Sequence, residues 1–281
     1  MMKRLLTTAL VGLAGAALSV STANAQSKIN VSAGDLVLGF FATSGTGAGQ
    51  DLEVDLGNAE KYITATPGQV INLSGSTGLA LADITATYGA GWASNSTLEW
   101  GVIAGNTVTA IAGATIDSIW ASDPETTPGT VSTPWVASTR SFQANGSSEA
   151  LTAEIGLNGA TSTANSSEAA VINGAIGDSY QATDNASAGA SFDYFNGNFA
   201  VDNPVTNVTS SKNSLSQLDA LYTSTAVNHN AVVLGTFDLN TTTGTFTFTA
   251  VPEPSSIGLT GVGFLSLIGF VALRRRRSVI A

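Results

Sequence analysis

The chain has no cysteine and only one histidine, His229, among its 281 residues. The lack of thiols excludes disulfide scaffolds, thiolate nucleophiles, iron–sulfur clusters and cysteine-rich zinc sites, and a lone histidine excludes a histidine-clustered metal site. A Ser-His-Asp triad would have to use His229, but the chain has no G-x-S-x-G elbow. We therefore expect a solvated loop histidine, no metal, no cofactor and no catalytic residue that the sequence can identify.

Charge is also scarce, because only 11% of the residues are charged. Residues 26–251 contain four basic and 19 acidic residues, a net charge of −15. This balance argues against a nucleic-acid partner, which would need a basic surface. Serine, threonine, asparagine and glycine make up 115 of the 281 residues, a polar composition that suits a hydrated exterior.

The N-terminus has the three parts of a secretory signal peptide. Lys3 and Arg4 precede an apolar run over residues 5–20, and Ala23-Asn24-Ala25 provides the small residues that signal peptidase requires. We predict export through the Sec translocon and cleavage between Ala25 and Gln26. The alternative is an uncleaved anchor helix, which the short, glycine- and alanine-rich run disfavours.

The C-terminus consists of Pro252-Glu253-Pro254, an apolar run over residues 257–273 and four arginines, Arg274, Arg275, Arg276 and Arg277. Seventeen residues of helix reach about 26 Å, which is just enough to span a thin bilayer. Arginines stay on the cytoplasmic side and stop translocation, so the residues before the run should lie outside. The alternative is a plain single-pass anchor in which P-E-P occurs by chance.

This order of P-E-P, apolar helix and arginine cluster resembles the PEP-CTERM sorting signal of Gram-negative bacteria. The resemblance implies recognition by exosortase, a membrane-embedded protease and transpeptidase, and a setting of exopolysaccharide production and biofilm formation. Segments such as GDLVLGFF and LGTFDLN also resemble ectodomains of PEP-CTERM proteins from Verrucomicrobia-like bacteria. Those ectodomains have no assigned chemistry. The implied organisation is a signal peptide over 1–25, an exported domain over 26–250 and a sorting signal over 251–281.

Between the two ends, the pattern predicts a mainly β protein: a single β-sandwich-like domain with one or two short helices. Expected strands, bounded by Gly, Pro, Asn and Ser, are Asp35–Phe41, Asp51–Leu56, Val70–Leu73, Leu98–Ala104, Thr107–Ile111, Ile116–Trp120, Val232–Leu239 and Thr245–Val251. The last two should form a hairpin with Phe246 and Phe248 on one face. Expected helices are Leu79–Tyr88 and Ser167–Ile176. Residues 121–166 could be a disordered linker or long loops between strands, and the aromatic residues spaced through them favour loops.

Three further patterns have both a functional and a plain interpretation. Gly45-Thr-Gly47-Ala-Gly49 is glycine-rich, but an alternating strand follows it and no lysine is near, so we expect a hairpin loop and no phosphate site. Asp51, Glu53 and Asp55 alternate like calcium ligands, yet a strand would place them in a row on one solvated face. Four tryptophans could stack on sugars, but they more often fill a core: Trp92, Trp100, Trp120 and Trp135.

From these observations we expect an exported, non-enzymatic surface or extracellular-matrix protein that exosortase processes at its P-E-P motif. The alternative is a secreted polysaccharide-binding protein or glycoside hydrolase. Glycoside hydrolysis needs only two carboxylates, and 19 acidic residues in the body neither exclude that chemistry nor locate it.

Overall fold

The computed structural model describes residues 26–125, 136–137, 140–184, 203–206, 208–210, 213–222 and 229–251. This part of the chain is mainly β, as predicted. Its centre is an antiparallel sheet with a path of nine neighbouring strands: β3 (Val70–Asn72), β13 (Phe246–Ala250), β12 (Val232–Asn240), β10 (Asn213–Leu221), β5 (Ser118–Pro124), β4 (Leu98–Asn106), β1 (Asp35–Ala42), β2 (Gln50–Asn58) and β7 (Ala169–Asn173).

Shorter elements complete the described fold. Strand β8 (Asn203–Pro204) pairs with β4, β9 (Val208–Ser210) pairs with β10, and β6 (Val136–Ala137) pairs with β11 (His229–Asn230). The helices are α1 (Glu60–Ile63), α2 (Leu81–Tyr88), α3 (Arg140–Leu157) and α4 (Tyr180–Asp184), with a single 3₁₀ turn, η1, at Trp92–Ser94.

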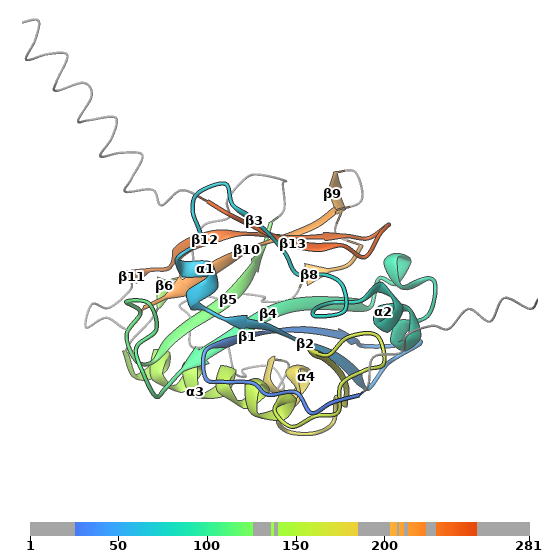
Figure 1. The fold of residues 1–281 in the computed structure, drawn as a ribbon, viewed down its shortest axis with the longest axis horizontal. Helices are drawn as coiled ribbons and strands as arrows, with labels where there is room; N and C mark the ends of the chain where they lie inside the picture. The colour runs from blue at the N-terminus through green and yellow to red at the C-terminus, as the bar shows by residue number, and fades with distance from the viewer. Residues whose placement is uncertain are drawn as a thin grey trace, which may run out of the picture.

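The sheet curls so that β3, β12 and β13 lie over β1, β2 and β4, while α3 and α4 lie beneath the second group (Figure 1). Successive side chains of a strand point to opposite faces of the sheet, so one strand contributes residues to two cores. In β1, Leu36, Leu38 and Phe40 enter the core inside the curl. Val37 and Phe41 enter a second core between the sheet and the helices. This explains why β1 is buried along its whole length, as its unbroken apolar run predicted.

The predicted hairpin is present as β12 and β13. Phe237 pairs with Phe248 across the two strands, and Phe246 and Phe248 are both fully buried on the same face. The Phe237 and Phe246 rings stack with centroids 5.4 Å apart, and Tyr62 from α1 meets Phe248 edge-on at 4.9 Å. Aromatic pairs in these geometries add stability beyond their buried area, so this cluster closes the inner core at the C-terminal end of the body.

Two predicted elements were wrong. Thr107–Ile111 is a bend and loop rather than a strand. Within Ser167–Ile176, where we predicted a helix, Ala169–Asn173 forms β7 and pairs with β2. The pairing explains the outcome, since the open edge of β2 supplies backbone hydrogen bonds that a short isolated helix could not match. The helix predicted at Leu79–Tyr88 is present as α2.

The longest described helix lies where we predicted loops. Helix α3 has 18 residues within the stretch 121–166, and the described residues contain four α-helices rather than one or two short ones. The helix contains Gly146 and Gly156. Glycine disfavours a helix interior, so the sequence did not predict a helix here. Ala150, Ala153 and Leu157 nevertheless follow helical spacing and are fully buried against the sheet. Tertiary packing thus overrode weak local propensity.

Candidate functional site at the end of the C-terminal strand

The body remains bound to its sheet up to the residue before the P-E-P segment. The Ala250 amide donates to the carbonyl of Gln69 at 3.0 Å, and the Gly68 amide donates to the carbonyl of Ala250 at 2.8 Å. The Val251 amide donates to the carbonyl of Leu234 at 3.1 Å. The loop between α1 and β3 therefore closes around the end of β13, and Val251 is the last described residue.

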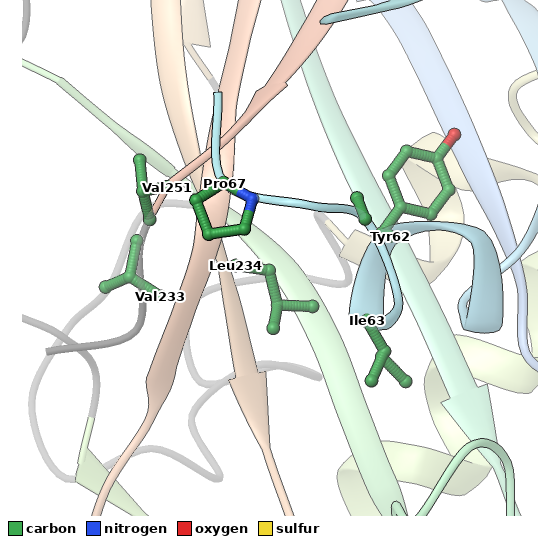
Figure 2. A pocket seen from close by; sticks show the side chains of 7 residues that line it. Tyr62, Ile63, Pro67, Val233, Leu234 and Val251 are labelled. Atoms are coloured by element: carbon green, nitrogen blue, oxygen red, sulfur yellow. The ribbon is translucent and has the colours of Figure 1, made fainter. Parts of the chain in front are cut away.

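A cavity of about 230 Å³ lies beside Val251 (Figure 2). Its lining comes from α1, the following loop, β12 and the residue after β13, and all of the lining residues are apolar or aromatic: Tyr62, Ile63, Ala65, Pro67, Val233, Leu234 and Val251. The sequence did not predict this cavity, because its lining residues come from segments that are distant in the chain. Its chemistry suits apolar contact and offers no acid, base or nucleophile.

The carboxylates of β2 contradict our prediction of a solvated face. Asp51 and Glu53 are fully buried and Asp55 is only 9% exposed. Glu53 Oε1 accepts a 2.7 Å hydrogen bond from the amide of Tyr180, and Asp51 Oδ2 accepts one of 2.7 Å from the amide of Gln181. The prediction failed because α4 covers this side of the strand. The start of a helix has amides without partners inside the helix, and the carboxylates supply the acceptors.

Burial shifts the proton affinity of this row. The pKa of Glu53 rises from 4.5 to about 8, mainly because burial disfavours the charged form; the Tyr180 amide opposes the rise, and Asp51 and Asp178 add to it. The pKa of Asp55 rises from 3.8 to about 6, again mainly through burial. Asp51, Glu53 and Asp55 do not converge, and no group of three or more His, Asp or Glu in the described residues could hold a metal ion.

A second buried acid, Glu154, was missed because its helix was not predicted. Its Oε1 accepts from the Gly105 amide at 2.8 Å and its Oε2 from the Gly34 amide at 3.0 Å. Burial raises its pKa to about 9, although both hydrogen bonds favour the charged form. Glu154 therefore joins α3 to β4 and to the start of β1. The helical spacing of Ala150, Ala153 and Leu157 was the signal that could have revealed it.

The other residues that the sequence offered as candidate site residues are part of the core, of a loop or of a strand. Trp92, Trp100 and Trp120 are buried in the inner core, so they form no exposed stacking platform, and Trp135 lies outside the described residues. The glycine-rich segment links β1 to β2 as a hairpin loop, with positive φ at Gly45, Gly47 and Gly49. His229 lies in the short strand β11 rather than in a loop.

A comparison with known protein families identifies a sorting motif near the C-terminus. A family model described as the PEP-CTERM protein-sorting motif matches residues 250–277. This chain carries a PEP-CTERM sorting signal. It is accordingly an exported protein that exosortase sorts, with anchoring at its C-terminal end. No curated protein and no solved structure matches the chain.

The PEP-CTERM signal begins at the end of the described body. The match starts at Ala250, the last residue of β13. Pro252, Glu253 and Pro254, the expected helix over 257–273 and Arg274–Arg277 lie outside the described residues, as do Ala23 and Ala25. Gln26, the residue after the predicted signal-peptide cleavage, is exposed. Within the described residues, no helix has both the length and the apolar character needed to cross a membrane.

Proposed function

We propose that this chain is a surface or matrix protein of a Gram-negative bacterium, and that exosortase releases its body from the C-terminal helix at Pro252-Glu253-Pro254. The observation that carries the proposal is the position of the signal relative to the fold. The backbone is bound to the sheet through Val251, and the P-E-P segment follows at the next residue. A protease can therefore cut beyond the body without unfolding β13.

We further propose that the body acts without catalysis. Supporting this, several groups in the described part of the chain that could have performed chemistry contribute to the fold. Glu53 binds the start of α4, Glu154 binds two strand amides, and the three described tryptophans lie in the core. A polar chain rich in serine, threonine and asparagine then provides a hydrated outer surface, as a matrix component requires.

The test replaces Pro252, Glu253 and Pro254 together by alanine and compares intact masses in the native host. If exosortase reads these residues, the wild-type protein loses the segment after the motif and is about 25 residues shorter, since the apolar run begins at residue 257 of 281. The triple-alanine variant should stay at full length in the inner membrane. The apolar helix and the arginines are unchanged, so both chains still insert.

A matched control replaces Thr241, Thr242 and Thr243 by alanine. These three consecutive residues lie in the turn between β12 and β13, close to the signal in sequence but outside the motif. This variant should be processed like the wild type. If the wild type and the P-E-P variant have the same mass, each retaining Arg274–Arg277, exosortase processing is refuted and a plain single-pass anchor remains.

The second candidate is a polysaccharide-binding protein or glycoside hydrolase. A depression of about 400 Å³ is lined by Gly49, Gly174, Ala175, Gln181 and Ala182, and a carboxylate oxygen of Asp51 lies close to Gly174. Glu53 follows Asp51 two residues later on β2 and is fully buried. A carboxyl with a raised pKa beside a second carboxyl is the arrangement of a glycosidase acid. A glycan array and a hydrolysis screen on the secreted protein separate the candidates: binding without turnover indicates a lectin, turnover that Glu53→Gln abolishes indicates an enzyme, and neither result supports the matrix role.

A further inference from the structure

Two segments that meet where the sorting signal emerges contain no charged side chain. Residues 62–82 and 239–252 contain no charged side chain, although the body as a whole has a net charge of −15. The structure brings these two uncharged segments together, because the loop after α1 pairs with the end of β13 and β3 pairs with β13. The flanking pair Glu60 and Lys61 on α1 sums to zero.

This surface also presents apolar side chains to solvent. We define the exit face as the segment Ile63–Val70 together with Val251. Val70, on the edge strand β3, is 63% exposed, and Pro67 is exposed beside it in the loop. Ile63 and Val251 are half-buried at the rim of the cavity described above (Figure 2). The exit face is therefore uncharged and partly apolar, unlike the acidic remainder of the body.

The length of the connecting chain limits how far the exit face can lie from a membrane. Only residues 252–256 separate Val251 from the apolar run that begins at residue 257. Five fully extended residues span at most about 18 Å. The polar layer of a bilayer occupies several ångströms of that distance. While the run is inserted, the body must therefore lie against the outer surface of the bilayer, with the end that bears Val251 nearest to it.

We propose that the exit face is a membrane-contact surface, which rests on the lipid headgroup region of the bilayer while the precursor is anchored. This inference rests on the membrane anchoring of the proposed function. Uncharged and apolar side chains enter the headgroup boundary at little cost, whereas the acidic faces would be repelled by anionic lipid. The contact need not be strong, because the tether holds the face at a high effective concentration near the surface. It would hold the P-E-P segment at the depth where a membrane-embedded protease works.

The chain's lack of cysteine makes the test direct. The precursor from Gln26 to Ala281 is prepared with a single added cysteine, either Val70→Cys on the exit face or Ile155→Cys on α3. The two original side chains are similarly exposed, at 63% and 57%, and α3 lies on the opposite side of the molecule from β3 (Figure 1). Each cysteine carries an environment-sensitive fluorophore, and the protein is reconstituted into phosphatidylcholine vesicles that contain a headgroup-region spin-labelled lipid.

We expect quenching by the spin-labelled lipid to be at least about twofold stronger at residue 70 than at residue 155. Equal quenching at the two positions, in protein that floats with the vesicles, would overturn the membrane contact and leave the anchoring intact. Failure of the precursor to float with the vesicles would instead refute the anchoring, and the inference with it. Shielding of residue 70 that needs no vesicles and grows with protein concentration would assign the face to a second copy of the chain, and shielding that appears only with exosortase would assign it to the enzyme.

Discussion

Glu53 and Glu154 are carboxylic acids buried inside the fold. Each forms hydrogen bonds with main-chain amides, yet removal from water dominates and raises the pKa of Glu53 to about 8 and that of Glu154 to about 9. The folded state binds these two protons more tightly than the unfolded chain does, so low pH favours folding. The body should thus be more stable at mildly acidic than at alkaline pH with respect to these two groups.

Glu53→Gln tests this pH dependence. Between about pH 4.5 and pH 8 the folded wild type keeps the Glu53 proton that the unfolded chain has released. The wild-type free energy of unfolding should therefore fall relative to that of the variant by about 1.4 kcal/mol for each pH unit in this window. The glutamine keeps an oxygen for the Tyr180 amide and cannot ionise. Urea unfolding of the exported protein at pH 5 and pH 8 measures the difference.

Glu60→Gln provides the control, because Glu60 is an exposed glutamate on α1. Its replacement should leave the pH dependence of unfolding as in the wild type. Parallel stability curves for wild type and Glu53→Gln would show that the buried carboxyl does not hold its proton.

At the scale of elements, α3 lies unusually close to β4. A Cβ built on Gly105 would lie 2.0 Å from the carbonyl oxygen of Ser147. The Ser147 hydroxyl accepts from the Asn106 amide at 2.9 Å, and Glu154 accepts from the Gly105 amide. The helix thus rests on the backbone of the strand, and its polar side chains bind strand amides directly. Only glycine at residue 105 allows this approach.

Gly105→Ala should consequently destabilise the body by about 1 to 3 kcal/mol, because the new methyl group must displace the helix backbone. Thermal and urea unfolding measure the change. Gly91→Ala is the matched control: Gly91 has φ −90° and no atom within 4 Å of an added Cβ, so this variant should unfold within about 0.5 kcal/mol of the wild type. Equal stability of the two alanine variants would contradict the close packing of α3 on β4.

For the whole molecule, both predicted processing points lie directly beside the described body. At the C-terminal end the sheet holds the chain through Val251. At the N-terminal end the Ser27 amide donates to the Ser162 hydroxyl at 2.8 Å, and the Ser162 amide donates to the carbonyl of Ser27. The described body is thus hydrogen-bonded from Ser27, close to the predicted cleavage after Ala25, to Val251, directly before the P-E-P segment.

N-terminal sequencing of the exported protein should give Gln26 as the first residue. Ala25→Leu should block this cleavage, since signal peptidase requires a small residue there, and the variant should retain Met1 or remain in the membrane. Ala17→Leu places the same change inside the apolar run and should still yield Gln26. Retention of Met1 in the wild type would contradict the secretory signal and support the uncleaved anchor.

The sorting signal of this protein can be recognised from a short stretch of sequence. Signals that act on an unfolded or extended chain are local, so the order P-E-P, apolar run and Arg274–Arg277 can be read without a structure. The sequence also predicted the mainly β fold and the final hairpin, because the alternation of Phe246 and Phe248 is a property of neighbouring residues.

What covers each strand depends on contacts that form only when the chain folds. Asp51 and Glu53 alternate as a solvated face would, but residues 180 and 181, far along the chain, bury them. Helix α3 needed the sheet to outweigh its glycines, and β7 needed the open edge of β2. The exit face likewise exists only because residues 63–70 fold around Val251. Burial and pairing depend on contacts between distant segments, and no local pattern contains that information.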